Sequence, residues 1–179
     1  MASSFNISKS FDFCYGHRVW TQELNKDFSL DSCSVCRHLH GHQGKVIVHL
    51  SSKSLVNGMV TDFAHLNWFK KFLDDNLDHR FIIDINDPLF GTLLPHFKDK
   101  KNLLDVDGIY KIPDFTSLDI ESHEKELYES YVIVDFVPTS ESLSNWLLEI
   151  VQAKMSQIDI DVSKIEFHET PKSKCEVYP

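Results

Sequence analysis

The stretch GKVIVHLSS, residues 44–52, restricts the fold more than any other part of the sequence. Val46, Val48 and Leu50 alternate with other residues, so in an extended chain they point to one face. Bulky and β-branched side chains favour a strand here. We therefore expect a strand with one apolar face and one more polar face.

Two later segments carry apolar residues at helical spacing. These residues are Phe63, Leu66, Phe69, Leu73 and Leu77 in the first segment, and Leu143, Trp146, Leu147, Ile150, Val151 and Met155 in the second. Thr61 or Asp62 can cap the first helix, and Thr139 or Ser140 can cap the second, by accepting backbone N–H groups. Both apolar faces are expected to pack in the core.

The order of the predicted elements indicates an α+β fold. Further strands are expected at 5–13 and 163–170, and residues 175–179 are a candidate for a last short strand. The order β-β-α-α-β-β predicts an antiparallel sheet with two helices on one face. A chain of 179 residues is expected to form one domain, spanning residues 1–179.

Residues 84–131 interrupt this order. They are rich in proline and acidic residues, and their apolar residues show little periodicity. A loop of this length is usually either functional or disordered. We interpret the segment as an insertion into the domain, partly ordered on the surface.

Composition narrows the possible partners and location. The formal net charge of −9 argues against binding a nucleic-acid backbone, which needs clustered lysine and arginine. The N-terminus lacks a basic region followed by an apolar run, so no secretory signal is predicted. No apolar segment approaches the roughly 20 residues that span a bilayer. We therefore predict a cytoplasmic protein, with no membrane or nucleic-acid partner, whose cysteines act as thiols, ligands or nucleophiles.

The motif HGH contains a candidate pair of metal ligands. His40 and His42 are two residues apart, so on a strand their imidazoles point to the same face, and Gly41 leaves room between them. His17 follows the first predicted strand and can supply a third imidazole; its alternative is a polar loop residue. Three histidines with an open fourth position are typical of catalytic zinc.

Two cysteines precede this motif. Cys33 and Cys36 form a CxxC that, with His40 and His42, could make a structural Cys2His2 site in a non-catalytic, zinc-stabilised interaction module. The spacing is compressed for such a site, and a redox CxxC usually opens a helix, which is not expected here. The remaining alternative is that one cysteine is a nucleophile or base beside a metal, where a nearby cation favours the thiolate.

Two further motifs contain ionisable residues that could act on a substrate. Asp78 and His79, in LDHRF, could be a carboxylate that orients an imidazole for proton transfer, or could simply end a helix. Glu169, at the end of a strand, could accept two N–H donors from a heterocycle, or could be solvated.

Taken in order, a histidine after the first strand, CRHLHGH, GMVTDF, LDH, PTSE and HET resemble the 6-pyruvoyl-tetrahydropterin synthase and 6-carboxy-tetrahydropterin synthase family. The resemblance covers the chain apart from residues 84–131. It implies the tunnelling fold, in which three subunits close their sheets into a barrel and two trimers usually stack. The protein is then expected to be a homo-oligomer, a trimer or hexamer, with active sites between subunits.

The resemblance also implies roles for individual residues. These are catalytic zinc ligands (His17, His40 and His42), proton-transfer partners of the catalytic cysteine (Asp78 and His79, which could serve a neighbour's zinc), an anchor for the pterin ring (Glu169, with Thr170 of the same motif), and candidate phosphate contacts (Lys172 and Lys174). Spacing selects the cysteine. In the 6-carboxy enzymes the cysteine precedes HGH with the spacing CxxxHGH, which Cys36 fits. The pyruvoyl enzymes have two more residues between the cysteine and HGH, and Cys33 fits neither spacing.

The implied substrate is 7,8-dihydroneopterin triphosphate. We expect zinc to act as a Lewis acid on the substrate hydroxyls, while Cys36 and the Asp78–His79 pair move protons. Elimination of triphosphate and carbon–carbon cleavage would release acetaldehyde and leave 6-carboxytetrahydropterin, a precursor of 7-deazaguanine compounds such as queuosine. The nearest alternative is 6-pyruvoyl-tetrahydropterin synthase activity, which eliminates triphosphate without that cleavage.

Overall fold

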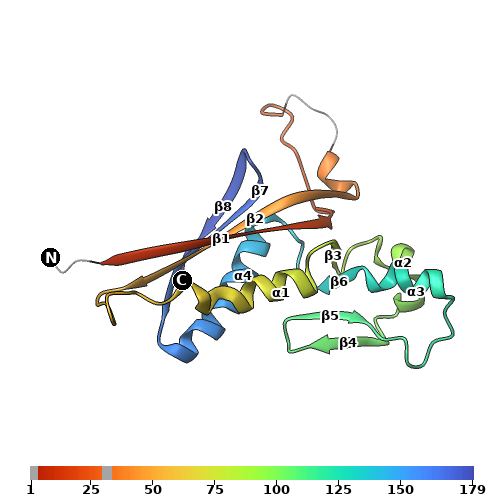
Figure 1. The fold of residues 1–179 in the computed structure, drawn as a ribbon. Coiled ribbons are helices and arrows are strands. Elements are labelled where there is room, and N and C mark those ends of the chain that lie inside the picture. Colours follow the sequence, from red (N-terminus) through yellow and green to blue (C-terminus); the bar gives the residue numbers. More distant parts are fainter. Residues whose placement is uncertain (1–3, 30–33) are drawn as a thin grey trace. The chain divides into compact units, whose positions relative to one another are not determined.

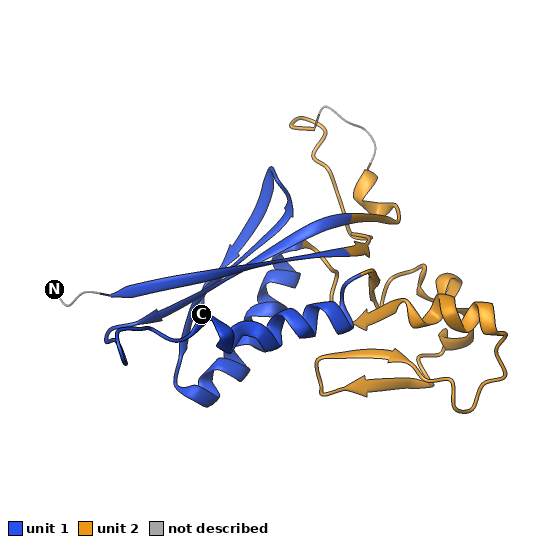
Figure 2. Cartoon of the chain, viewed as in Figure 1, with its two compact units in different colours: residues 1–14, 42–78, 140–179 blue, residues 15–41, 79–139 orange. Residues whose placement is uncertain are grey.

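The computed structural model describes residues 4–29 and 34–179. The chain divides into two compact units, coloured separately in Figure 2. Unit 1 consists of residues 1–14, 42–78 and 140–179, and unit 2 consists of residues 15–41 and 79–139. Each unit is therefore built from segments that are distant in the sequence.

Unit 1 contains a four-stranded sheet covered by helices. The strands are hydrogen-bonded in the order β1 (Phe5–His17), β2 (His40–Ser52), β7 (Asp161–Thr170) and β8 (Ser173–Val177), with β7 antiparallel to both of its neighbours. The last residues of β1 and the first residues of β2 belong to unit 2. The helices are the 3₁₀ turn Phe63–Leu66, α1 (Asn67–Asn76), α4 (Ser140–Met155) and the 3₁₀ turn Ser156–Ile158 (Figure 1).

The alternating pattern that predicted a half-buried strand is confirmed. Val46, Val48 and Leu50 are completely buried, and they lie on the face that the helices cover. The ring of Phe11 on β1 meets the ring of Phe69 on α1 edge-on, with centroids 5.2 Å apart. This apolar layer fixes the register of the strands, because a shift by one residue would turn these side chains to solvent.

The opposite face of the same sheet is ionic. Glu166 lies on β7, with only 8% of its surface exposed. Its Oε1 is 2.6 Å from Lys164 Nζ and 2.8 Å from His49 Nε2, and its Oε2 accepts a hydrogen bond from Lys174 Nζ at 3.1 Å. The hydrogen bond from Lys164, followed by the one from Lys174, lowers the pKa of Glu166 from 4.5 to about 2. We call Glu166, His49, Lys164 and Lys174 the Glu166 network.

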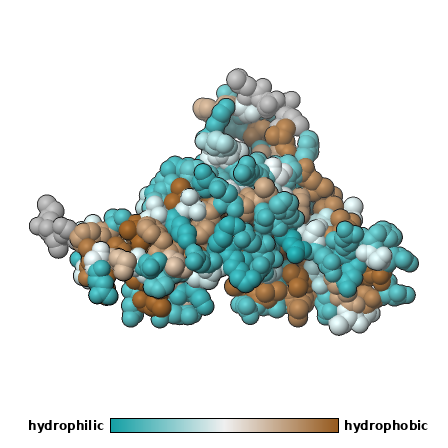
Figure 3. Space-filling model, viewed as in Figure 1, coloured by the Kyte–Doolittle hydropathy of each residue, from teal (hydrophilic) through white to brown (hydrophobic). Residues whose placement is uncertain are grey.

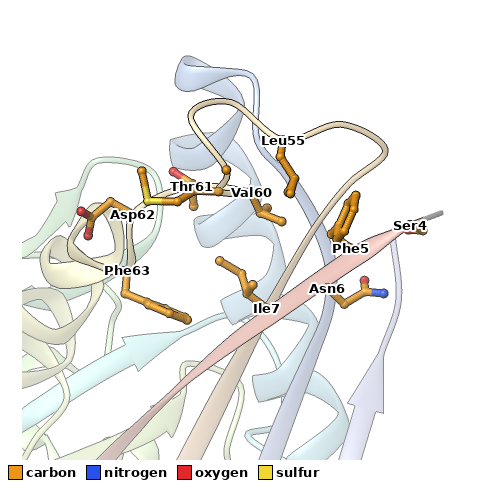
Figure 4. Close-up of a pocket in the computed structure, with 11 residues that line it drawn as sticks. Ser4, Phe5, Asn6, Ile7, Leu55, Val60, Thr61, Asp62 and Phe63 are labelled. Carbon is orange, nitrogen blue, oxygen red and sulfur yellow. The ribbon is translucent and has the colours of Figure 1, made fainter.

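Unit 1 also carries an open hollow of about 520 Å³ at the N-terminal end of β1 (Figure 4). Phe5, Ile7, Leu55 and Phe63 are among its lining residues, and Figure 3 shows apolar residues toward this end of β1. Phe63 was expected in a core-facing helix, yet 49% of its surface is exposed. It begins a 3₁₀ turn in which the predicted cap Asp62 accepts the N–H of residue 64, so the regular α-helix starts four residues later.

Unit 2 contains shorter strands and its own core. Its strands are β3 (Arg80–Asp84), β4 (Leu103–Val106), β5 (Tyr110–Pro113) and β6 (Tyr131–Val134), hydrogen-bonded in the order β4-β5-β6-β3. Strand β3 also pairs with the last residues of β1. Its helices are α2 (Phe90–Leu93), α3 (Ser122–Glu129) and the 3₁₀ turns Val35–Arg37 and Pro95–Phe97. The core residues are Ile83, Phe90, Leu94, Phe97, Tyr128, Tyr131 and Ile133.

The α+β fold is confirmed, but the four strands of the predicted antiparallel sheet are joined by β3, β4, β5 and β6. Strand β3 runs parallel to both β1 and β6, so the eight-stranded sheet is mixed. Residues 84–131, interpreted as an insertion, contain β4, β5, α2 and α3 and supply much of the unit 2 core. The prediction of one domain spanning 1–179 stays a prediction. Within the described ranges, none of the helices has the length and apolar character needed to cross a bilayer.

Candidate metal centre

The candidate centre lies where β1 ends and β2 begins. His17 is the last residue of β1 and is completely buried, and His40 is the first residue of β2. The backbones approach closely here: a Cβ atom on Gly41 would lie 2.8 Å from the carbonyl oxygen of Tyr15. Glycine is therefore required between the two histidines of HGH so that the strands can meet.

The three histidines predicted as metal ligands are brought together. His17, His40 and His42 each offer one ring nitrogen, and these atoms all lie within 4.8 Å of one another. The rings of His17 and His40 have centroids 4.5 Å apart. Three imidazole nitrogens at this separation can hold one divalent metal ion.

Backbone carbonyls orient two of these imidazoles. His17 Nδ1 lies 2.6 Å from the carbonyl oxygen of Pro138, and His40 Nδ1 lies 2.8 Å from that of His38. A carbonyl oxygen only accepts, so each Nδ1 carries the proton and donates it. The lone pair then resides on Nε2, which is the arrangement that a metal-binding histidine needs. The donor set and its orientation therefore fit a metal ion.

Glu169 lies beside the third histidine. Its Oε1 is 3.7 Å from His42 Nε2, and both side chains are largely buried. The register of β7 against β8 shifts between His168 and Thr170, which re-aims the side chain between them. The glutamate predicted to anchor a heterocycle is thus located next to the three-histidine group.

The other residues predicted to contact substrate have varied surroundings. Thr170 accepts a weak hydrogen bond from the N–H of Lys172, whose side chain is exposed. Lys174 donates to Glu166 at 3.1 Å and to Glu176 at 2.5 Å. Its ammonium group is engaged by these two carboxylates, whereas Lys172 remains at the surface.

Cys36 lies in the 3₁₀ turn Val35–Arg37, with a half-buried thiol. Its N–H donates to Gln22 Oε1 at 2.9 Å, and its carbonyl accepts the N–H of Val19 at 2.7 Å. The thiol does not belong to the group of three ligand atoms found in the described part of the chain. Cys33 lies outside the described residues.

Asp78 and His79 follow helix α1. Asp78 Oδ1 accepts the N–H of Cys14 on β1 at 2.7 Å, which fixes the carboxylate against the strand. His79 is exposed and has a positive φ of 58°, a conformation that costs energy for residues other than glycine. Such conformations often occur at functional sites. Neither residue contributes to the three-histidine group among the described residues.

Comparisons with known proteins point to one family. The family described as 6-pyruvoyl tetrahydropterin synthase matches residues 6–179. A 6-carboxy-5,6,7,8-tetrahydropterin synthase from Aquifex aeolicus is 31% identical to this chain, over 96% of both proteins. A putative 6-carboxy-5,6,7,8-tetrahydropterin synthase from Pyrococcus horikoshii is 29% identical, over 88% of this chain and 87% of that protein.

Solved structures show the same fold. An uncharacterised protein from Wolinella succinogenes is 62% identical, with a TM-score of 0.95 over 98% of each chain. The 6-pyruvoyl tetrahydropterin synthase of Plasmodium vivax shares 16% identity and a TM-score of 0.59, over 99% of this chain and 98% of that one. The Plasmodium likeness shows the fold alone. The predicted tunnelling fold is confirmed.

Proposed function

Because the chain belongs to the 6-pyruvoyl tetrahydropterin synthase family, we propose that it is a zinc-dependent 6-carboxy-5,6,7,8-tetrahydropterin synthase. It would convert 7,8-dihydroneopterin triphosphate to 6-carboxytetrahydropterin, acetaldehyde and triphosphate, in the route to 7-deazaguanine compounds such as queuosine. The observation that carries the proposal is the three-histidine group in a chain whose Cys36 precedes HGH with the CxxxHGH spacing. The relative from Aquifex aeolicus, which bears this activity in its name, supports it.

The metal in this proposal is zinc, held by His17, His40 and His42. Three neutral imidazoles with an open fourth position suit catalytic zinc. When bound, the ion would supply a Lewis acid for a substrate oxygen. The Pro138 and His38 carbonyls hold the His17 and His40 rings in the required tautomer.

Protons are moved by the chain's own groups. Cys36, as a thiolate, accepts a proton from the substrate side chain, and Asp78 orients His79 for the return transfer. The N–H of Cys14 holds Asp78 in place for this role. Glu169 accepts the N–H donors of the pterin ring, and its position beside His42 brings the ring close to the ligand group.

We propose that the enzyme works as a homo-oligomer, a trimer or hexamer, with active sites between subunits. Among the described residues, β1 pairs with β2 along one side and meets β3 only at Tyr15 and Gly16, so its unit 1 residues have no strand partner on the other side, while β8 ends the strand order. Both outer edges thus present backbone groups that strand pairing can satisfy. A head-to-tail contact between β1 and β8 of different copies would close a ring.

A product assay tests the proposal. The zinc-loaded protein is incubated with 7,8-dihydroneopterin triphosphate, and acetaldehyde and 6-carboxytetrahydropterin are quantified. Both products are expected in equal amounts. A pyruvoyl product without acetaldehyde would show that the chain is a 6-pyruvoyl-tetrahydropterin synthase instead. No product, together with loss of zinc and unfolding in a Cys33→Ala, Cys36→Ala double variant, would favour the non-catalytic interaction module.

A further inference from the structure

A buried ion pair anchors the segment that follows β1. Arg18 Nη1 lies 3.3 Å from Asp87 Oδ1, with 9% and 1% of the two side chains exposed. Asp87 also accepts the N–H of Leu89 at 2.8 Å, which fixes the turn after β3. A buried pair of opposite charges is held tightly, because separation would leave either charge uncompensated.

A second carboxylate reinforces this anchor. Trp20 donates its indole N–H to Asp84 Oδ2 at 2.9 Å, and Asp84 is a buried residue at the end of β3. Its other oxygen accepts the N–H of Asn86 at 2.8 Å. Asp84 and Asp87 stand at the start of the segment 84–131, so the insertion provides both anchoring carboxylates. The segment 18–22 has no regular secondary structure of its own, and these contacts set its position.

The anchored segment in turn holds Cys36. The N–H of Val19 donates to the Cys36 carbonyl at 2.7 Å, and the Cys36 N–H donates to Gln22 Oε1 at 2.9 Å. Arg37 Nε donates to the carbonyl of Gln22 at 2.7 Å. The backbone carbonyl of Cys36 is therefore bonded by Val19, and its backbone N–H is bonded by the side chain of Gln22.

We propose that Gln22 is a positioning residue for the Cys36 thiol, and that Asp84 and Asp87 of the insertion anchor the segment from which it acts. The proposal rests on the proposed function, in which Cys36 exchanges a proton with the substrate. A group with that task must be held to within about 0.5 Å of its working position, by neighbours that are themselves fixed. The insertion thereby contributes to catalysis without contributing a catalytic residue.

The experiment compares variants of the zinc-loaded enzyme. Gln22→Met keeps the side-chain length but removes the oxygen that accepts the Cys36 N–H, whereas Gln22→Glu keeps an accepting oxygen. Gln157→Met is the matched control, because Gln157 makes only a long hydrogen bond of 3.4 Å to the carbonyl of Ala153. Turnover of 7,8-dihydroneopterin triphosphate, zinc content and the rate of Cys36 alkylation by iodoacetamide, followed by peptide mass spectrometry, are measured.

Gln22→Met is expected to lower kcat by about tenfold or more, because displacement of a reacting group is costly even when substrate binding is intact. Its KM is expected to stay within about twofold of wild type, its alkylation rate to change about threefold or more, and its zinc content to be unchanged. Gln22→Glu is expected to recover most of kcat, and Gln157→Met to match wild type. Trp20→Phe removes the N–H that Asp84 accepts, together with one ring of the indole, and should lower kcat by about threefold.

Three outcomes would overturn the positioning role. One is a Gln22→Met enzyme with wild-type kcat and wild-type alkylation. The other two, an equal loss of kcat in Gln22→Glu and a loss of zinc in Gln22→Met, would mark a structural role. Wild-type kcat in Trp20→Phe would overturn the anchoring role. If wild type makes no 6-carboxytetrahydropterin, the proposed function fails, and the alkylation rates still decide whether Gln22 positions the thiol.

Discussion

Replacing Glu166 with glutamine should destabilise the protein in a pH-dependent way. The carboxylate is buried on the ionic face of the unit 1 sheet and receives hydrogen bonds from Lys164 and Lys174. Glu166→Gln preserves the shape of the side chain but removes one of the two carboxylates that Lys164 and Lys174 share, leaving Glu176. The perturbation therefore isolates the charge of the Glu166 network from its packing.

The size of the effect follows from the pKa. Folding lowers the pKa of Glu166 from 4.5 to about 2, and at about 1.4 kcal/mol per unit this corresponds to roughly 3 kcal/mol of stability. The unfolded state binds the proton more tightly, so this contribution is complete above pH 4.5. It is lost progressively as the pH falls from 4.5 towards 2.

Urea unfolding at fixed protein concentration, from pH 7 down to pH 3, measures this contribution. Wild type should exceed Glu166→Gln in free energy of unfolding by about 3 kcal/mol at pH 7, and the difference should shrink steadily below pH 4.5. Glu23→Gln, which changes an exposed carboxylate outside the network, is the control and should alter little at any pH. A difference that is absent at pH 7, or equally large at pH 3, would refute the reasoning.

Three further predictions concern the metal centre. Cys36→Ala should abolish turnover while zinc stays bound, and Cys33→Ala should lower turnover only slightly, as measured by activity assays and metal analysis; the reverse ranking would refute the assignment of Cys36. His40→Ala should weaken zinc binding by about 100-fold or more, since even the loss of outer contacts costs roughly 10–100-fold; competition with a chelator measures this, and unchanged affinity would exclude His40 as a ligand. Gly41→Ala forces a Cβ to 2.8 Å from the Tyr15 carbonyl, so thermal unfolding should reveal a loss of about 1–3 kcal/mol, and unchanged stability would contradict the close approach of the strands.

The regular parts of unit 1 could be predicted from local pattern. Alternation at 44–52 and the two helical stripes placed β2, α1 and α4, because each buries one face against the same core. The HxH spacing placed His40 and His42 on one face of a strand, and His17 was located by its position after the preceding strand. Phe63 departed from its stripe because the first turn is a 3₁₀ turn that leaves the ring at the surface.

Unit 2 could not be predicted in the same way. Strand β6, with the sequence YVIV, is buried on both faces and shows no alternation. Its parallel pairing with β3 depends on the long connection between them rather than on any local signal. The contacts that anchor the segment beside Cys36 were missed for a similar reason: Arg18 and Asp87 form their ion pair across 69 positions of sequence. Only the folded structure shows that Asp87 pairs with Arg18 and that Asp84 accepts the indole N–H of Trp20.

The strand order of unit 1 has a consequence for synthesis on the ribosome. Strand β2 pairs with β7, and residues 53–160 separate the two strands. At roughly 5–20 residues per second, their translation takes on the order of ten seconds. Throughout that interval the nascent chain carries HGH and its apolar strand without the neighbour that completes the sheet. The histidines of HGH thus emerge early, whereas β7 and β8, which complete the sheet around them, are synthesised only after residues 53–160.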